Sequence, residues 1–161
     1  SGAPSLASTV ADAHIIFKYF RDTLKATGYR GSLFIMGRSL GSLSAVELAV
    51  SYPKEIKGLI IESGFASAGK LLMYLGTLIS FPRLEDFERA TLERLRSITI
   101  PILIIHGEWG EIITFEQAEV IYQNIGSKDK KLLRIPNAGH NDIMIVGMQE
   151  YFQAVKDFVA S

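Results

Sequence analysis

The sequence contains no cysteine among its 161 residues. Disulfide bonds, cysteine nucleophiles and metal sites built on thiolates are therefore excluded. The histidines and acidic residues do not recur at the spacings typical of metal ligands either. The sequence thus predicts neither a metal centre nor any other cofactor.

An excess of charge of either sign is also absent. The 17 Lys and Arg residues are balanced by 17 Asp and Glu residues, whereas proteins that bind nucleic acid usually carry a basic excess. The longest apolar run, Leu71–Phe81, has 11 residues, while a membrane-spanning helix needs about 20. Residues 1–5 lack the charged and apolar parts of a signal peptide. We expect no nucleic-acid partner, no transmembrane segment and a cytoplasmic location.

Two kinds of apolar pattern alternate along the chain. Some segments have apolar residues at helical spacing, and others are short continuous apolar runs, which suit strands covered on both faces. The expected helices are 8–27, 40–50, 115–125 and 148–159, and the expected strands are 32–36, 59–61, 102–105 and 131–135. Such alternation predicts the α/β class, a mostly parallel sheet with flanking helices. We expect one domain over residues 1–161.

Residues 65–99 break this alternation. An apolar helix is expected around Leu71–Ile79, followed by a charged stretch over 83–96 in which no strand is evident. An insertion at the carboxyl edge of a parallel sheet is where a lid over an active site would sit. Two ordinary packing helices would produce the same pattern.

Ser39 lies in a Gly-Arg-Ser-Leu-Gly sequence between an expected strand and an expected helix. This context predicts a nucleophile elbow, a strained turn that exposes the serine hydroxyl. We expect Gly37 and Gly41 to be glycines because larger side chains would collide with neighbouring backbone. The N–H of Leu40, at the start of the helix, would serve as an oxyanion donor. The alternative is a tight glycine-rich turn with a surface serine.

His140 follows the last expected strand and precedes the last helix. The carboxyl ends of parallel strands meet at one edge of a sheet, so His140 and Ser39 can meet there despite their separation in sequence. A serine hydroxyl needs such a neighbouring base, and the base needs an acid that orients it. His140 is the predicted base, with a surface histidine as the alternative. His106 and His14 are expected to be structural.

Four segments together carry a family resemblance: GRSLGS, GLIIESGF, PILIIHGEWGEII and LLRIPNAGHNDI. With the closing amphipathic helix they resemble the carboxyl-terminal portion of the α/β-hydrolase superfamily, and within it the serine-esterase and thioesterase-like branch. The resemblance covers nearly the whole chain. It implies hydrolysis of a small-molecule ester or thioester through an acyl-enzyme, with Ser39 as nucleophile and His140 as base.

The acid departs from the family pattern. The resemblance places it at Gly110, which has no carboxylate. Glu111 is the predicted substitute, with Glu108 and Glu62 as alternatives. Without an acid the tautomer and orientation of the histidine are unspecified, which costs about 10⁴-fold in rate in the serine-protease template.

The sheet departs from the family pattern as well. The expected strands correspond to the later part of the family's sheet, so the fold is expected to lack the N-terminal strands and the loop that supplies a second oxyanion donor. A strand left unpaired at the edge predicts self-association. The alternative function is accordingly a catalytically impaired hydrolase-like fragment or a non-enzymatic binding module. Acyl transfer to an acceptor other than water would use the same residues.

Overall fold

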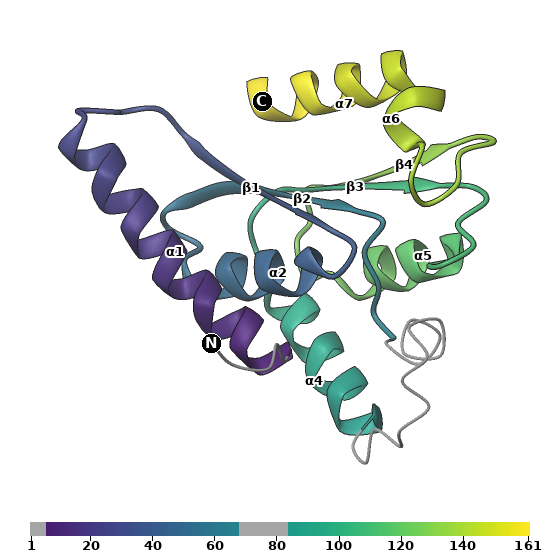
Figure 1. Cartoon of the computed structure of the whole chain (residues 1–161), viewed down its shortest axis with the longest axis horizontal. Helices are drawn as coiled ribbons and strands as arrows, with labels where there is room; N and C mark the ends of the chain where they lie inside the picture. Colours follow the sequence, from purple (N-terminus) through teal and green to yellow (C-terminus); the bar gives the residue numbers. More distant parts are fainter. Residues whose placement is uncertain (1–5, 68–83) are drawn as a thin grey trace.

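The computed structural model describes residues 6–67 and 84–161. Four parallel strands form one sheet in the order β1-β2-β3-β4 (Figure 1). The strands are β1 (Leu33–Arg38), β2 (Ile56–Glu62), β3 (Ile102–Gly107) and β4 (Lys130–Ile135). The helices are α1 (Leu6–Ala26), α2 (Gly41–Ser51), α4 (Leu84–Ser97), α5 (Phe115–Asn124), α6 (Ile143–Val146) and α7 (Met148–Ala160).

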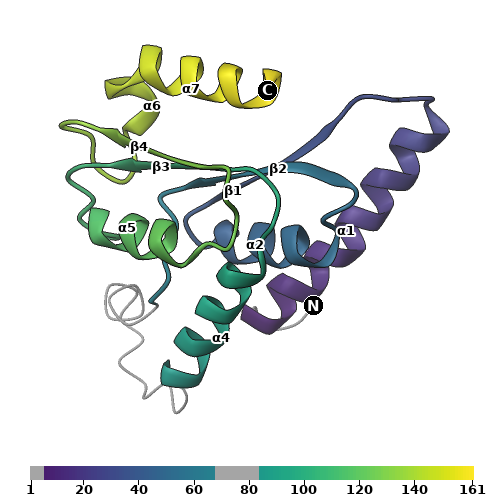
Figure 2. The same cartoon turned by 180° about the vertical axis from the view of Figure 1, so that it is seen from behind.

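The helices lie on both faces of the sheet. Helices α6 and α7 cover one face, and α1, α2, α4 and α5 lie on the other in both views (Figures 1 and 2). All six residues of β3 are buried, as are six of the seven in β2, whereas β1 and β4 are partly exposed. This pattern explains why the central strands read as continuous apolar runs. The predicted class, a mostly parallel sheet with flanking helices, is confirmed.

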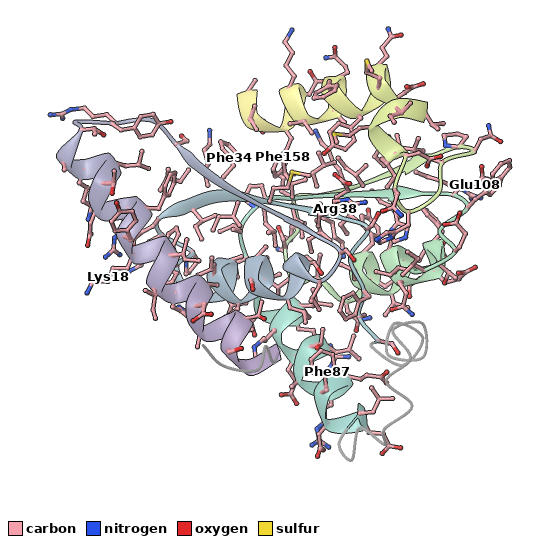
Figure 3. All side chains as sticks on the ribbon, viewed as in Figure 1. Lys18, Phe34, Arg38, Phe87, Glu108 and Phe158 are labelled. Carbon is pink, nitrogen blue, oxygen red and sulfur yellow. The ribbon has the colours of Figure 1, made fainter. Side chains whose placement is uncertain are left out.

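The apolar core has one part on each face of the sheet. Leu59, Ile61, Ile102 and Ile104 pack toward α2 and α5, and the alternate residues Ile60, Leu103 and Ile105 pack toward α7. Phe34 of β1 meets Phe158 of α7 with ring centroids 5.8 Å apart (Figure 3). The period-two alternation of a strand thus divides its side chains between two helical layers.

The expected elements recur in the structure with small shifts at their ends. Strands β1 and β3 run two residues beyond the expected apolar runs, through Gly37–Arg38 and His106–Gly107. The short helix α6 was not predicted. The apolar helix expected around Leu71–Ile79 lies outside the described residues. Within the described part of residues 65–99, α4 packs against α2 and α5.

Strand β1 pairs only with β2 in the described sheet, so its other edge is free. This matches the expectation of an unpaired edge strand, and self-association through it stays a prediction. None of the helices that the structure describes has the length and apolar character needed to cross a membrane.

Candidate functional site

Ser39 occupies the tight turn between β1 and α2. Its backbone has a φ of +49°, in the left-handed region that serine seldom adopts. The Ser39 N–H donates to the carbonyl of Glu62 at 2.9 Å, and the Ser42 N–H donates to the Ser39 carbonyl at 3.0 Å. The strained turn is therefore held by β2 on one side and by α2 on the other, in the strand–turn–helix order expected for a nucleophile elbow.

The two glycines of the turn differ in what surrounds them. A Cβ built on Gly37 would lie 2.6 Å from Cβ of Ala45 and 2.7 Å from the Gly41 carbonyl oxygen. A Cβ on Gly41 would have no heavy atom of the described residues within 4 Å. The expected steric requirement for glycine is confirmed at Gly37. It is wrong at Gly41, because Gly41 is the first residue of α2 and is exposed.

Leu40 lies at the N-terminus of α2 with a φ of −56° and a ψ of −34°. Its N–H has no backbone acceptor among residues 6–67 and 84–161, as is usual for the first turn of a helix. Such an N–H favours negative charge. Leu40 therefore has the geometry of an anion donor beside Ser39.

His140 lies in the loop after β4, where its side chain is buried. Two carboxylates accept hydrogen bonds from the backbone of this loop. Asp142 Oδ1 accepts from the Gly139 N–H at 2.7 Å, and Glu111 Oε2 accepts from the His140 N–H at 3.4 Å. The Ala138 carbonyl accepts from the Trp109 N–H at 2.8 Å, which joins the loop to the end of β3. His140 is thus fixed through its backbone.

Arg38 connects the Ser39 turn to the His140 loop. From the last position of β1 its Nη2 donates to the His140 carbonyl at 2.8 Å and to Asn141 Oδ1 at 3.0 Å. Figure 3 shows Arg38 at the carboxyl end of the sheet. The structure therefore brings the two predicted catalytic segments together, although within its described residues no hydrogen bond joins the Ser39 and His140 side chains. Arg38 was not predicted from the sequence, despite its place next to Ser39 in the motif.

The three carboxylates considered for the acid differ in their partners. Glu108 accepts from Arg134 and from the Asn137 N–H, and these contacts, the Asn137 N–H foremost, hold its pKa below the ordinary value. Glu62 accepts from Arg38 Nε at 2.9 Å and from the Tyr151 hydroxyl at 2.7 Å. Glu111 is the one of the three that bonds the His140 residue itself, through the N–H.

No carboxylate reaches the His140 ring in the described part of the chain. His140 Nδ1 is buried there without a hydrogen-bond partner. The position where the family resemblance places the acid, Gly110, has no room for one. A Cβ on Gly110 would lie 2.0 Å from the Ile113 carbonyl oxygen. An aspartate at this position therefore requires a different course of the loop before α5.

His106 fills the space beneath this loop. Its ring is buried at the end of β3, and Nε2 lies 2.9 Å from the Ile113 carbonyl oxygen, so Nε2 carries the proton and donates it. Phe115 packs edge-on against the ring with centroids 6.0 Å apart. The structural role that we expected for His106 fits these contacts. His14 instead contacts the Tyr52 hydroxyl and Glu47.

Burial lowers the pKa of both His106 and His140 below the ordinary value of 6.5. For His140 the positive charge of Arg38 and the nearby His106 lower the pKa further, whereas Glu111 and Glu62 oppose the shift. A histidine with a lowered pKa is neutral at pH 7 and has a free lone pair for a proton. The electrostatics thus suit His140 as a base.

The same shifts predict a loss of stability in acid. As the pH falls below about 6.5, histidines in the unfolded chain bind protons before the folded His106 and His140 do. The free energy of unfolding should therefore be fully present above that pH and decline as the pH drops toward the lowered folded pKa values. Urea unfolding at about pH 7.5 and about pH 5.5 measures the decline.

His106→Gln should flatten this pH profile, because the Gln amide can donate to Ile113 without titrating. The comparison uses the slope with pH, since the substitution also changes packing and lowers the absolute stability. Parallel profiles for the parent and the variant would contradict the assignment.

Ser63 is a buried polar residue that was not predicted as part of the site. It follows β2, has a φ of +47°, and its hydroxyl has no hydrogen-bond partner among the described residues. Its N–H donates to the Ile105 carbonyl at 2.9 Å. The sequence signal that could have drawn attention to Ser63 is its place directly after Glu62, at the end of an apolar strand. In the ranges 6–67 and 84–161, no group of three His, Asp or Glu side chains could hold a metal ion.

The chain is similar to α/β-hydrolase proteins over almost its full length. It is 27% identical over 165 residues to the protein bem46 of Schizosaccharomyces pombe, covering 99% of this chain and 53% of that protein. It is 29% identical over 165 residues to α/β hydrolase domain-containing protein 17B of Xenopus laevis, covering 99% of this chain and 52% of that protein. The chain thus spans about half the length of these relatives. No family model matches it.

Solved structures show the same fold. An esterase of Pyrococcus furiosus, Pf2001, superposes with a TM-score of 0.78 at 18% identity, covering 99% of this chain and 65% of that one. A monoacylglycerol lipase of Paleococcus ferrophilus gives a TM-score of 0.67 at 18% identity, covering 92% of this chain and 75% of that one. The four parallel strands and their helices therefore correspond to part of these longer chains.

Proposed function

We propose that this chain, which belongs to the α/β-hydrolase superfamily by its fold and its relatives, is a serine hydrolase that acts on ester or thioester bonds. The observation that carries the proposal is the position of Ser39. It sits at a φ of +49° between β1 and α2, and Arg38 bonds the adjacent His140 loop. Nucleophile and base thus come from the same edge of the sheet.

In the proposed reaction, the Ser39 hydroxyl attacks the substrate carbonyl while His140 Nε2 accepts its proton. The carbonyl oxygen becomes an oxyanion, which the Leu40 N–H at the start of α2 stabilises. The intermediate collapses when His140 returns the proton to the leaving alcohol or thiol. Water then attacks the acyl-Ser39 ester by the same path, which releases the acid and restores the hydroxyl. Transfer to another acceptor would replace only this last step.

Glu111 is the proposed acid. Its carboxylate accepts from the His140 N–H and its negative charge opposes the lowering of the His140 pKa. The Glu111 side chain is exposed, so it can rotate about its own bonds toward the ring without displacing core residues. In this proposal it stabilises the protonated imidazole that forms during attack.

Covalent labelling tests the proposal. A fluorophosphonate probe reacts with an activated serine and leaves an adduct that peptide mass spectrometry assigns to one residue. We expect the adduct on Ser39 in the folded parent protein. A well-folded parent that gives no adduct would exclude an activated Ser39.

Glu111→Gln should slow this labelling. Gln keeps the shape and can still accept from the His140 N–H, but it removes the negative charge. We expect a loss of about tenfold or more, short of the ~10⁴-fold lost when the buried acid of a serine protease is made neutral. Second-order labelling rates at pH 7 measure it. Glu108→Gln is the matched control, because Glu108 bonds Arg134 and Asn137. A slower control with an unchanged Glu111→Gln rate would assign the acid to Glu108.

A second candidate function is a hydrolase-like binding module without turnover. It is favoured by His140 Nδ1, which has no partner among the described residues, and by the lack of space for an acid at Gly110. In that case Ser39 stays unlabelled while a panel of esters and thioesters still protects the protein against thermal unfolding. Helix α4 packs against α2 and α5, as the alternative of an ordinary packing helix expected, so we propose no lid role for it. Under either function, a cytoplasmic location and one domain over residues 1–161 remain predictions.

A further inference from the structure

We infer that Arg38 is a positioning residue that holds the His140 loop against the Ser39 turn. The catalytic role of Arg38 rests on the proposed function, whereas its contact with the His140 loop is independent of that function. Arg38 Nη2 donates to the His140 carbonyl at 2.8 Å and to Asn141 Oδ1 at 3.0 Å, across more than 100 residues of sequence.

Glu62 fixes the direction in which Arg38 points. The Glu62 residue is 2% exposed, and its Oε1 accepts from Arg38 Nε at 2.9 Å. The other oxygen accepts from the Tyr151 hydroxyl of α7 at 2.7 Å. Burial, with the adjacent Glu62, raises the pKa of Tyr151, so its hydroxyl stays a donor at any pH near neutrality. The Arg38 side chain is 43% exposed, and Glu62 keeps its Tyr151 hydrogen bond when Arg38 is replaced, so we expect the loss of this ion pair to act mainly on the His140 loop.

Glu62 also holds the nucleophile. Its backbone carbonyl accepts from the Ser39 N–H at 2.9 Å, while its side chain directs Arg38 to the His140 carbonyl. Glu62, the last residue of β2, thus holds the Ser39 turn in position through its backbone carbonyl. It holds the His140 loop in position through its side chain, which orients Arg38. A displacement of either segment has to break one of these hydrogen bonds.

Among the described residues no carboxylate contacts the His140 ring, which makes this link more important. In the usual triad a carboxylate on Nδ1 orients the histidine ring, and here Nδ1 has no described partner. The loop is held instead by contacts to its backbone, among them those from Glu111 at the His140 N–H and from Arg38 at the His140 carbonyl. Of these contacts, the one from Arg38 links the loop to the strand that leads into the Ser39 turn.

The test compares Arg38→Gln and Arg38→Lys in the whole chain. A matched control is Arg94→Gln, because Arg94 also donates from Nε to a partly buried carboxylate, Glu47, at 2.8 Å, but between α4 and α2. Two properties are measured. The first is the rate of fluorophosphonate labelling at Ser39, resolved into probe binding and chemical step. The second is amide hydrogen exchange of residues 136–143 relative to the rest of the chain.

For Arg38→Gln we expect the chemical step of labelling to slow by about tenfold to hundredfold, as a misplaced catalytic group does, with probe binding little changed. Exchange at the Gly139 and His140 amides should quicken at least about tenfold, which corresponds to about 1.4 kcal/mol. Arg38→Lys keeps the charge but loses the fork of donors, so it should fall between parent and Arg38→Gln. Arg94→Gln should leave both measurements at parent values.

The two readouts separate this inference from the proposed function. If the parent protein is not labelled, the proposed function fails, and hydrogen exchange alone decides whether Arg38 holds the loop. If the parent is labelled and Arg38→Gln matches it in both labelling and loop exchange, the inference is overturned. Uniformly faster exchange over the whole sheet would also overturn it, since Arg38 would then contribute to general stability only.

Discussion

Ser39→Ala should reduce fluorophosphonate labelling and any ester hydrolysis to the background of the uncatalysed reaction. The substitution removes one oxygen, and that oxygen is the atom that would form the acyl-enzyme. In a serine protease, loss of the nucleophile costs roughly 10⁶-fold in turnover. The loss should be of that order here if the parent is fully active, and labelling should be lost completely if Ser39 is the hydroxyl that the probe attacks.

Folding provides the control for Ser39→Ala. The turn is held by the Ser39 N–H and carbonyl, which alanine keeps, so the midpoint of thermal unfolding should change by only a few degrees. His140→Gln should abolish labelling as well, with Ser39 still present. Labelling that persists in Ser39→Ala would place the reactive group elsewhere, and one candidate is Ser63, whose buried hydroxyl has no hydrogen-bond partner among the described residues.

Gly37→Ala should destabilise the protein, whereas Gly41→Ala should not. At Gly37 the added methyl group meets Ala45, the Gly41 carbonyl and the Ser42 Cα, all within 2.7 Å. Two of these atoms belong to the backbone of the turn and α2, so the turn itself has to open. Overpacking of this kind costs about 1–3 kcal/mol, and the opened turn should also slow the labelling of Ser39.

Gly41→Ala is the matched control at the other end of the same motif. Gly41 is the first residue of α2, and its methyl group would meet no described atom. Replacing a helical glycine by alanine stabilises by about 0.4–1 kcal/mol because the unfolded chain loses freedom. Urea unfolding of both variants should therefore give shifts of opposite sign. Equal destabilisation would show that the turn requires glycine on both sides, as the sequence motif alone suggested.

Strand and helix order was predictable because the central strands are buried on both faces. A continuous apolar run such as Ile102–Ile105 is typical of a strand covered on both sides, and the alternation of such runs with amphipathic segments favours a parallel sheet. The ends of the strands were harder to predict. Arg38 and His106 belong to strands but are polar, so an apolar pattern ends before them although the backbone ladder continues.

Ser39 and His140 could be proposed from sequence because both follow strands of one parallel sheet. For the acid, the sequence predicted Glu111 but left Glu108 and Glu62 as alternatives. Glu62, Glu108 and Glu111 are all close to a strand end in sequence, and only the side-chain contacts separate them: Glu62 turns to Arg38 and Tyr151, and Glu108 turns to Arg134. Tyr151 lies 89 residues from Glu62, a distance over which no local pattern can predict a hydrogen bond.

Local sequence patterns were enough to predict the α/β class, the order of its strands and helices, and the two segments that carry Ser39 and His140. Periodicity and motif spacing are local properties, and these features depend on local rules. Tertiary structure alone decided which glycine of the motif is required, why an acid has no room at Gly110, and how Glu62 and Arg38 join the nucleophile turn to the base loop. Those features depend on atoms that meet across the end of the sheet, and their distances are set only when the chain has folded.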